Sequence, residues 1–266
     1  MFTMPEKIIY ALPEQIGNTE LFVGRKKEFD YYLGDWYYYL VNNMAQSQAI
    51  VARRKKGKTA FLQRLFNILW SCSESKVIPF YYAIQEEQIT RASFAKEFFA
   101  TFASHYLSFL TRNEEWVRTP FDYVEMKEYI TQYPDLYKKS KSIDAYEKTG
   151  NWDLMWKVAS RIPFDIAVST GVKVVQIIDE FQNINAYILD ERGNTIDTMS
   201  GAYLILAEKR EAPLIISGSE VHGLLEIVRR LTARFKERTL GNLPEDEAKE
   251  AIRRYAKASR TKINEQ

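Results

Sequence analysis

The chain has 266 residues, with 37 Lys and Arg against 35 Asp and Glu, and this formal net charge of +2 argues against a surface devoted entirely to nucleic acid. Hydrophobic residues make up 46% of the chain, a share that excludes intrinsic disorder and fibrous repeats and predicts a sizeable folded core. The single cysteine, Cys72, cannot form an internal disulfide, and no stretch approaches the ~18 apolar residues of a membrane span, so we expect a cytoplasmic protein without a membrane partner.

Short apolar segments alternate with amphipathic ones along most of the chain. The predicted strands are 48–52, 77–84, 172–178, 214–217 and 235–240, and the predicted helices are 58–71, 92–110, 223–231 and one that starts near residue 243. Pro79 is unfavourable for a central strand. Strands that alternate with helices predict a parallel, right-handed α/β sheet. The segment 112–163 carries helical patches that do not fit this alternation, and we interpret it as an insertion.

The most informative stretch is the basic turn at 52–59, between the first strand and an amphipathic helix. Gly57, Lys58 and Thr59 supply what a phosphate loop needs: amides at a helix N-terminus, an ammonium for the β and γ phosphates, and a hydroxyl for Mg²⁺. The pattern departs from G-x-x-x-x-G-K-[ST] at its first position, where Ala52 requires a negative φ. A solvated turn that only opens a helix is the alternative, but the flanking strand and helix favour the phosphate loop.

Two carboxylates, Asp179 and Glu180, follow the most apolar strand, at the edge where open α/β sheets bind ligands. Asp179 would hold Mg²⁺, directly or through water, and Glu180 would orient and deprotonate a water that attacks the γ-phosphate. The alternative is a strand that simply ends in surface acids. We expect these carboxylates to face the phosphate loop across a gap sized for a triphosphate and its cation.

Four stretches in this order resemble the AAA+-related P-loop ATPases often called archaeal ATPases, which are related to the STAND signalling NTPases. Residues 21–28 resemble an F-x-G-R-x-x-E element near adenine, and 53–59 resemble an Arg-rich phosphate loop. Residues 178–182 are similar to a Walker B strand ending in D-E-F-Q, and 214–219 to a sensor-1 strand. The resemblance spans about 21–243 and does not cover 112–163.

The resemblance implies a three-layer P-loop NTPase sandwich. Its five-stranded parallel sheet would have the order 5-1-4-3-2, with the acidic strand beside the phosphate-loop strand. The implied domains are an N-terminal extension at 1–20, an ATPase core at 21–243 with the insertion at 112–163, and the start of a helical lid at 244–266. Because the family continues with more of the lid and often a winged helix, we expect a fragment or a lidless variant.

The resemblance also implies ATP and Mg²⁺ as ligands and assigns roles to residues. Catalysis would fall on Glu180, on Ser219 as the sensor residue, and on Arg234 as a finger acting on a neighbour's γ-phosphate, although a plain basic helix end is the favoured alternative for Arg234. Thr59 and Asp179 would hold the metal. The residues expected to bind nucleotide are Val23, Gly24, Arg25, Arg54, Lys55, Lys56, Gly57, Lys58, Thr59 and Ala60.

The leading hypothesis is a Mg²⁺-dependent ATP-hydrolysing switch or motor module of AAA+ type. One alternative is an ATP-dependent accessory protein that binds nucleic acid, with DNA as a possible partner. The aromatic run 36–40 could stack bases in such a protein, although helix core is the favoured interpretation of that run. A second alternative is a scaffold that binds nucleotide without hydrolysing it. A homo-oligomer and a further protein partner are also expected, and ATP rather than GTP rests on the resemblance.

Overall fold

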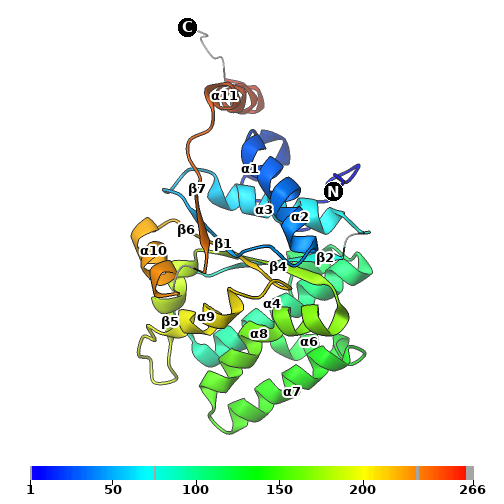
Figure 1. Ribbon diagram of the computed structural model, residues 1–266, viewed down its shortest axis with the longest axis vertical. Helices are drawn as coiled ribbons and strands as arrows, with labels where there is room; N and C mark the ends of the chain where they lie inside the picture. The colour runs from blue at the N-terminus through cyan, green and yellow to red at the C-terminus, as the bar shows by residue number, and fades with distance from the viewer. Residues whose placement is uncertain (1, 75, 232–233, 262–266) are drawn as a thin grey trace.

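The computed structural model describes residues 2–74, 76–231 and 234–261, and its centre is a parallel sheet of five strands (Figure 1). The strands are β1 (Gln48–Val51), β2 (Val77–Ala83), β4 (Lys173–Asp179), β6 (Leu214–Gly218) and β7 (Lys236–Thr239), in the order β2-β4-β6-β1-β7. If these five strands are numbered 1 to 5 along the chain, their order in the sheet is 2-3-4-1-5. This is the predicted order 5-1-4-3-2 read from the opposite edge. The labels differ because β3 (Ile89–Thr90) and β5 (Ile188–Leu189) form a separate small sheet that was not predicted.

One predicted neighbour relation is wrong. The acidic strand β4 pairs with β2 and β6, whereas the phosphate-loop strand β1 pairs with β6 and β7. The sensor strand β6 therefore separates the two strands that were expected to lie side by side. Any contact between the phosphate loop and the carboxylates after β4 must reach across the end of β6.

Helices cover both faces of the sheet, so the structure is the predicted three-layer sandwich (Figure 1). One face carries α3 (Lys58–Ser71) and a continuous helix made of α1 (Lys26–Asp30), the π-helical turn η2 (Tyr31–Asp35) and α2 (Trp36–Val41). The other face carries α4 (Arg91–Thr111) and α8 (Trp152–Thr170). The remaining helices are α5 (Glu115–Arg118), α6 (Tyr123–Tyr129), α7 (Pro134–Lys148), α9 (Tyr203–Leu206), α10 (Val221–Arg230), α11 (Glu245–Ser259) and the 3₁₀ turns η1 (Thr19–Leu21), η3 (Phe181–Asn185) and η4 (Met199–Ala202).

The proline of β2 is accommodated because β2 is an edge strand. The Ile84 N–H points toward β4, where it donates to the Asp179 carbonyl at 3.0 Å. The Tyr81 N–H points the other way and donates to Nδ1 of the buried His105, on α4, at 3.4 Å. Alternate residues of a strand direct their N–H groups to the same side, and Pro79 lies two residues before Tyr81. The N–H that proline lacks would therefore point to the unpaired edge of the sheet. His105 is thus a neutral acceptor at that edge, and burial lowers its pKa to about 3.

The segment 112–163 is helical, as expected, and it packs on the core. Trp156 lies against Phe94 and Phe98 of α4, with ring centroids 5.0 and 5.5 Å apart. Because α8 is one helix from 152 to 170 and contacts β4, the boundary proposed at 163 falls inside an element of the core layer.

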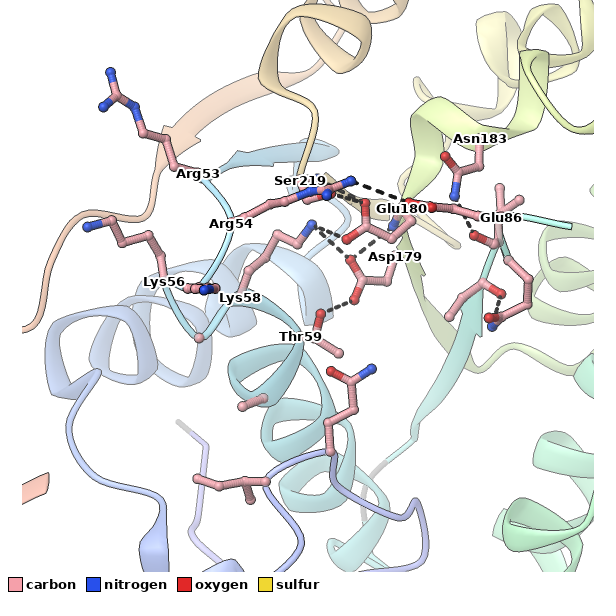
Figure 2. A pocket seen from close by; sticks show the side chains of 18 of the residues that line it. Arg53, Arg54, Lys56, Lys58, Thr59, Glu86, Asp179, Glu180, Asn183 and Ser219 are labelled. Carbon is pink, nitrogen blue, oxygen red and sulfur yellow. Dashed lines mark hydrogen bonds and ion pairs between the residues drawn. The ribbon is translucent and has the colours of Figure 1, made fainter. Parts of the chain in front are cut away.

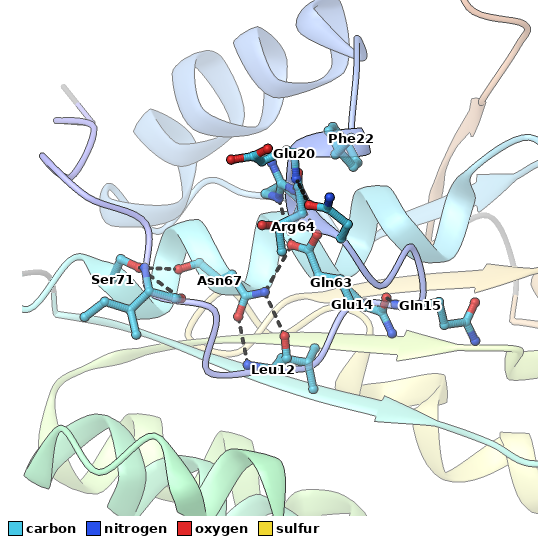
Figure 3. A network of polar contacts seen from close by, with 12 residues as sticks. Leu12, Glu14, Gln15, Glu20, Phe22, Gln63, Arg64, Asn67 and Ser71 are labelled. Carbon is cyan, nitrogen blue, oxygen red and sulfur yellow. Dashed lines mark hydrogen bonds and ion pairs between the residues drawn. The ribbon is translucent and has the colours of Figure 1, made fainter. Parts of the chain in front are cut away.

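The N-terminal segment is fastened along α3 by buried polar contacts (Figure 3). Arg64 donates from Nε and Nη2 to the two carboxylate oxygens of Glu14 at 2.7 and 2.9 Å, and both residues are buried. Asn67 exchanges two hydrogen bonds of 2.9 Å with the backbone of Leu12. The Arg64 guanidinium also lies 4.3 Å from the ring centre of Phe22. These contacts explain why polar positions of α3 are buried.

The helix α11 lies apart from the sheet at the C-terminal end of the chain (Figure 1). It contacts the segment 20–25: Oε2 of Glu247 accepts from the Arg25 N–H at 2.9 Å, and Arg254 donates to the Glu20 carbonyl at 2.9 Å. Residues 262–266 of the expected lid lie outside the described residues. Within the described ranges, no helix combines the length and apolar character needed to cross a bilayer.

We predict that Glu14→Gln lowers the free energy of unfolding by about 3 kcal/mol, because it leaves the buried Arg64 guanidinium without a counter-charge. Urea unfolding monitored by circular dichroism measures this loss. The matched control is Glu226→Gln, which breaks the exposed pair with Arg230 on α10 and should cost less than about 1 kcal/mol. Equal losses in the two variants would contradict a structural role for the buried pair.

Candidate functional site

A cavity of about 730 Å³ lies at the carboxyl edge of the sheet (Figure 2). Segments far apart in the sequence form its walls: the phosphate loop, the ends of β2 and β4, the residue after β6, the N-terminal segment and α11. The lining residues include Gln15, Ile16, Arg53 through Ala60, Tyr81, Ala83, Ile84, Gln85, Glu86, Asp179, Glu180, Asn183, Ser219 and Tyr255. The structure therefore brings the predicted phosphate loop and both predicted carboxylates to one site.

The phosphate loop adopts left-handed backbone conformations just before α3. Gly57 has φ 73° and Lys55 has φ 66°, and the latter is strained for a residue with a side chain. Ala52 is buried and is not among the described residues with a positive φ, so its position in the motif does not demand glycine. Because α3 begins at Lys58, the N–H groups of its first turn have no helical partner and lie at the cavity, where they can bind an anion.

Lys58 bridges the phosphate loop and the acidic strand end directly (Figure 2). Its Nζ lies 2.8 Å from Oε1 of Glu180 and 3.4 Å from Oδ1 of Asp179, and only 6% of the side chain is exposed. Thr59 donates from Oγ1 to Oδ2 of Asp179 at 2.7 Å. The expected groups thus meet, but in contact rather than across a gap. The cavity beside them provides the open volume.

Glu180 is held in a strained backbone conformation by four donors. Its φ is 52°, in the left-handed region. Besides Lys58, its carboxylate accepts from Gln182 Nε2 at 2.7 Å and from the N–H and Oγ of Ser219 at 2.9 and 2.8 Å. Burial raises the pKa of this carboxyl, but the hydrogen bonds from Lys58, Gln182 and Ser219 outweigh burial and lower the pKa to about 2. Glu180 is therefore ionised at neutral pH.

Asp179 is 1% exposed and is fixed by residues that the sequence analysis did not identify. Ser217 of β6 donates to its Oδ1, and the Tyr81 hydroxyl lies 3.4 Å from its Oδ2. Gln182, which holds Glu180, belongs to the D-E-F-Q stretch of the resemblance, but no role was predicted for it. One signal was available for Ser217, since a polar residue near the carboxyl end of a neighbouring parallel strand must lie near the same edge. Tyr81 carries no such signal.

The oxygens around Thr59 and Asp179 fit a magnesium ion. A hydroxyl and a carboxylate are hard ligands, and Mg²⁺ commonly takes one or two protein oxygens together with phosphates and water. The described ranges contain no cluster of three His, Cys, Asp or Glu that would hold a metal unaided. The donor set therefore suits a metal that arrives with a phosphorylated ligand.

The predicted element Val23, Gly24 and Arg25 supports the loop from behind and is not among the residues that line the cavity. Arg25 is buried, and its guanidinium donates to the carbonyl of Lys56. Gly24 has φ 81°, and a Cβ added there would lie 2.3 Å from Oε2 of Glu247. The backbone conformation thus favours glycine, and a larger residue would also displace the Glu247 side chain of α11.

Arg234, the remaining predicted catalytic residue, lies away from the cavity. It donates to Glu208 Oε1 at 2.6 Å and to the Leu204 carbonyl at 2.8 Å. Thr232 and Ala233, which precede it, lie outside the described residues. A role for Arg234 in the site of a neighbouring chain stays a prediction.

No protein-family model matches the sequence, and no curated protein sequence does. Among solved structures, a Walker-type ATPase of Pyrococcus abyssi superposes with a TM-score of 0.54 at 15% identity, and the match covers 96% of this chain and 64% of that protein. The chain has a P-loop NTPase fold. Cdc6p of Pyrobaculum aerophilum is similar at a TM-score of 0.45 and 10% identity, over 96% of this chain and 55% of that one. The ORC2 protein of Aeropyrum pernix is similar at a TM-score of 0.40 and 13% identity, and the match covers 95% of this chain and 54% of that one.

The depressed pKa of Glu180 predicts an acid-sensitive contribution to stability. The carboxyl has a pKa of about 2 in the fold against an ordinary 4.5, so its contribution is fully present above pH 4.5 and is lost as the pH falls toward 2. The free energy of unfolding should fall from pH 5 to pH 3 in the wild type, and this fall should be about 1 kcal/mol smaller in Glu180→Gln. The figure allows for the partial exposure of the Glu180 side chain. Urea unfolding at the two pH values measures this, and Glu226→Gln should keep the wild-type difference. An unchanged difference in Glu180→Gln would contradict the assignment.

Proposed function

We propose that this chain binds ATP with Mg²⁺ and hydrolyses it, as a switch or motor module. The observation that supports this most strongly is the contact of Lys58 and Thr59 with Asp179 and Glu180 beside a cavity at the carboxyl edge of the sheet. Each group required for phosphate binding and for activating water is present there. The AAA+ type is supported by the fold and by the four sequence stretches.

Binding of the triphosphate requires Lys58 to exchange partners. Its ammonium is nearly buried and is neutralised by the two carboxylates. Phosphate oxygens would take Lys58 and the free amides at the start of α3. Thr59 and Asp179 would hold Mg²⁺, which neutralises charge on the phosphate oxygens when bound.

Glu180 becomes a better base once Lys58 leaves it. The hydrogen bond from Lys58 is the largest of the effects that lower the pKa of Glu180, so its removal raises that pKa toward the ordinary value. The N–H and Oγ of Ser219 still hold the other carboxylate oxygen and fix its orientation. Glu180 can then accept a hydrogen bond from a water and take its proton during attack on the terminal phosphate.

The proposal predicts that Lys58→Ala abolishes ATP binding. The variant loses the ammonium that would bind the phosphates, and it leaves the charges of Asp179 and Glu180 without this cation beside the site. Titration of purified protein with a fluorescent ATP analogue and Mg²⁺ measures the affinity. Lys138→Ala, which removes an exposed lysine of α7, should bind as the wild type does. Retention of wild-type affinity in Lys58→Ala would overturn the proposed site.

Glu180→Gln is predicted to retain ATP binding but to lower phosphate release at least about a hundredfold, because the amide cannot accept the proton of the attacking water. Turnover is measured as phosphate release at saturating ATP. A variant that hydrolyses ATP at the wild-type rate would show that Glu180 is not the base. A wild-type protein that binds ATP without turnover would support the non-hydrolysing scaffold instead.

A further inference from the structure

An ion pair at the cavity joins Arg54, which was expected to bind nucleotide, to Glu86, for which no role was predicted. Nη2 of Arg54 lies 3.6 Å from Oε1 of Glu86, and both residues line the cavity. The side chains are 74% and 58% exposed, so the pair lies on the solvent side of the nearly buried Lys58. Figure 2 shows Arg54 reaching toward Glu86 while Arg53 turns away.

The two residues of this ion pair follow strands that are not neighbours in the sheet. Arg54 follows β1 and Glu86 follows β2, and both β6 and β4 lie between these strands. At about 4.8 Å per strand, the ends of β1 and β2 are roughly 14 Å apart. The pair therefore spans the ends of β6 and β4, which carry Ser219 and Glu180.

The segment that carries Glu86 is fixed beside the acidic strand end. The Ile84 N–H donates to the Asp179 carbonyl at 3.0 Å, and Asn183 Nδ2 donates to the Ile84 carbonyl at 2.8 Å. The Arg54 guanidinium thus meets Glu86 on the side of the cavity where β4 ends, away from the loop that bears it. This is the side where the proposed attacking water meets the terminal phosphate.

The pair is weak enough to be displaced by a phosphate. Exposed ion pairs contribute about 0–1 kcal/mol, whereas a guanidinium binds phosphate oxygens through two parallel, charge-assisted hydrogen bonds. The lining residues carry five cationic side chains against three anionic ones, and Lys58 already contacts two of these anions. A phosphate group near Glu180 would therefore compete with Glu86 for Arg54.

We propose that Arg54 distinguishes a nucleoside triphosphate from a diphosphate by leaving Glu86 and binding the terminal phosphate. Arg54 is then a specificity-determining residue, and Glu86 is an anion that competes for it when no terminal phosphate is present. This inference rests on the proposed function, because it requires a nucleotide with its phosphates at Lys58. Beyond that function, the inference assigns recognition of the third phosphate to the Arg54 guanidinium, a cation of the same chain.

The test compares ATP and ADP affinities, with Mg²⁺, in wild type, Arg54→Ala, Arg54→Lys and Glu86→Gln. Arg54→Ala should weaken ATP about tenfold or more and ADP less than about threefold. Arg54→Lys should restore only part of the ATP affinity, because an ammonium cannot form the paired hydrogen bonds. Glu86→Gln should tighten ATP about two- to fivefold, and this gain should vanish when Arg54→Ala is also present.

The controls are Arg230→Ala and Glu226→Gln, each of which breaks an exposed ion pair on α10 and should change neither affinity. Equal weakening of ATP and ADP in Arg54→Ala would overturn the inference and leave the proposed function standing, since general loss of positive charge acts on both ligands. A gain in Glu86→Gln that persists without Arg54 would also overturn it. Failure of the wild type to bind either nucleotide would overturn both proposals.

Discussion

The site depends on one nearly buried ammonium. Lys58 begins α3, and its charge needs anionic partners because only 6% of the side chain meets solvent. The chain supplies two carboxylates at the end of β4, across the end of β6. A parallel sheet makes this possible because all its strands end at the same edge. The strained backbone of Glu180 is consistent with a residue held in place by its surroundings rather than by its own preference.

Contacts outside the cavity hold the phosphate loop and α3 in position. Arg25 donates to the Lys56 carbonyl from behind the loop, and Glu247 on α11 accepts from the Arg25 N–H. On the other side, the buried pair of Glu14 and Arg64 fastens the N-terminal segment to α3 and brings Gln15 to the cavity wall. Residues 12–15 of the expected N-terminal extension are thus part of the structure that supports the site.

The elements that the sequence predicted best are those with strong hydrophobic patterns. The helix at 58–71 has its predicted bounds, and the five strands lie within two residues of their predicted ends. Burial leaves nearly uninterrupted apolar runs in β1, β2, β4 and β6, whereas the mostly exposed β7 has no such run. The two-residue strands β3 and β5 were missed because they are too short to show a period. The neighbour relation between β1 and β4 was wrong because strand pairing depends on tertiary packing. Tyr81 was missed because a hydroxyl within an apolar strand has no pattern of its own, whereas Ser217 could have been found from its place near the carboxyl end of a parallel strand.

The central claim is that the ammonium of Lys58 exchanges carboxylates for phosphates. The most direct measurement is a crystal structure of the protein with Mg²⁺ and a non-hydrolysable ATP analogue. The account predicts Nζ of Lys58 within hydrogen-bond distance of a β- or γ-phosphate oxygen and no longer in contact with Glu180. A nucleotide bound elsewhere, with Lys58 still paired to Glu180, would contradict it.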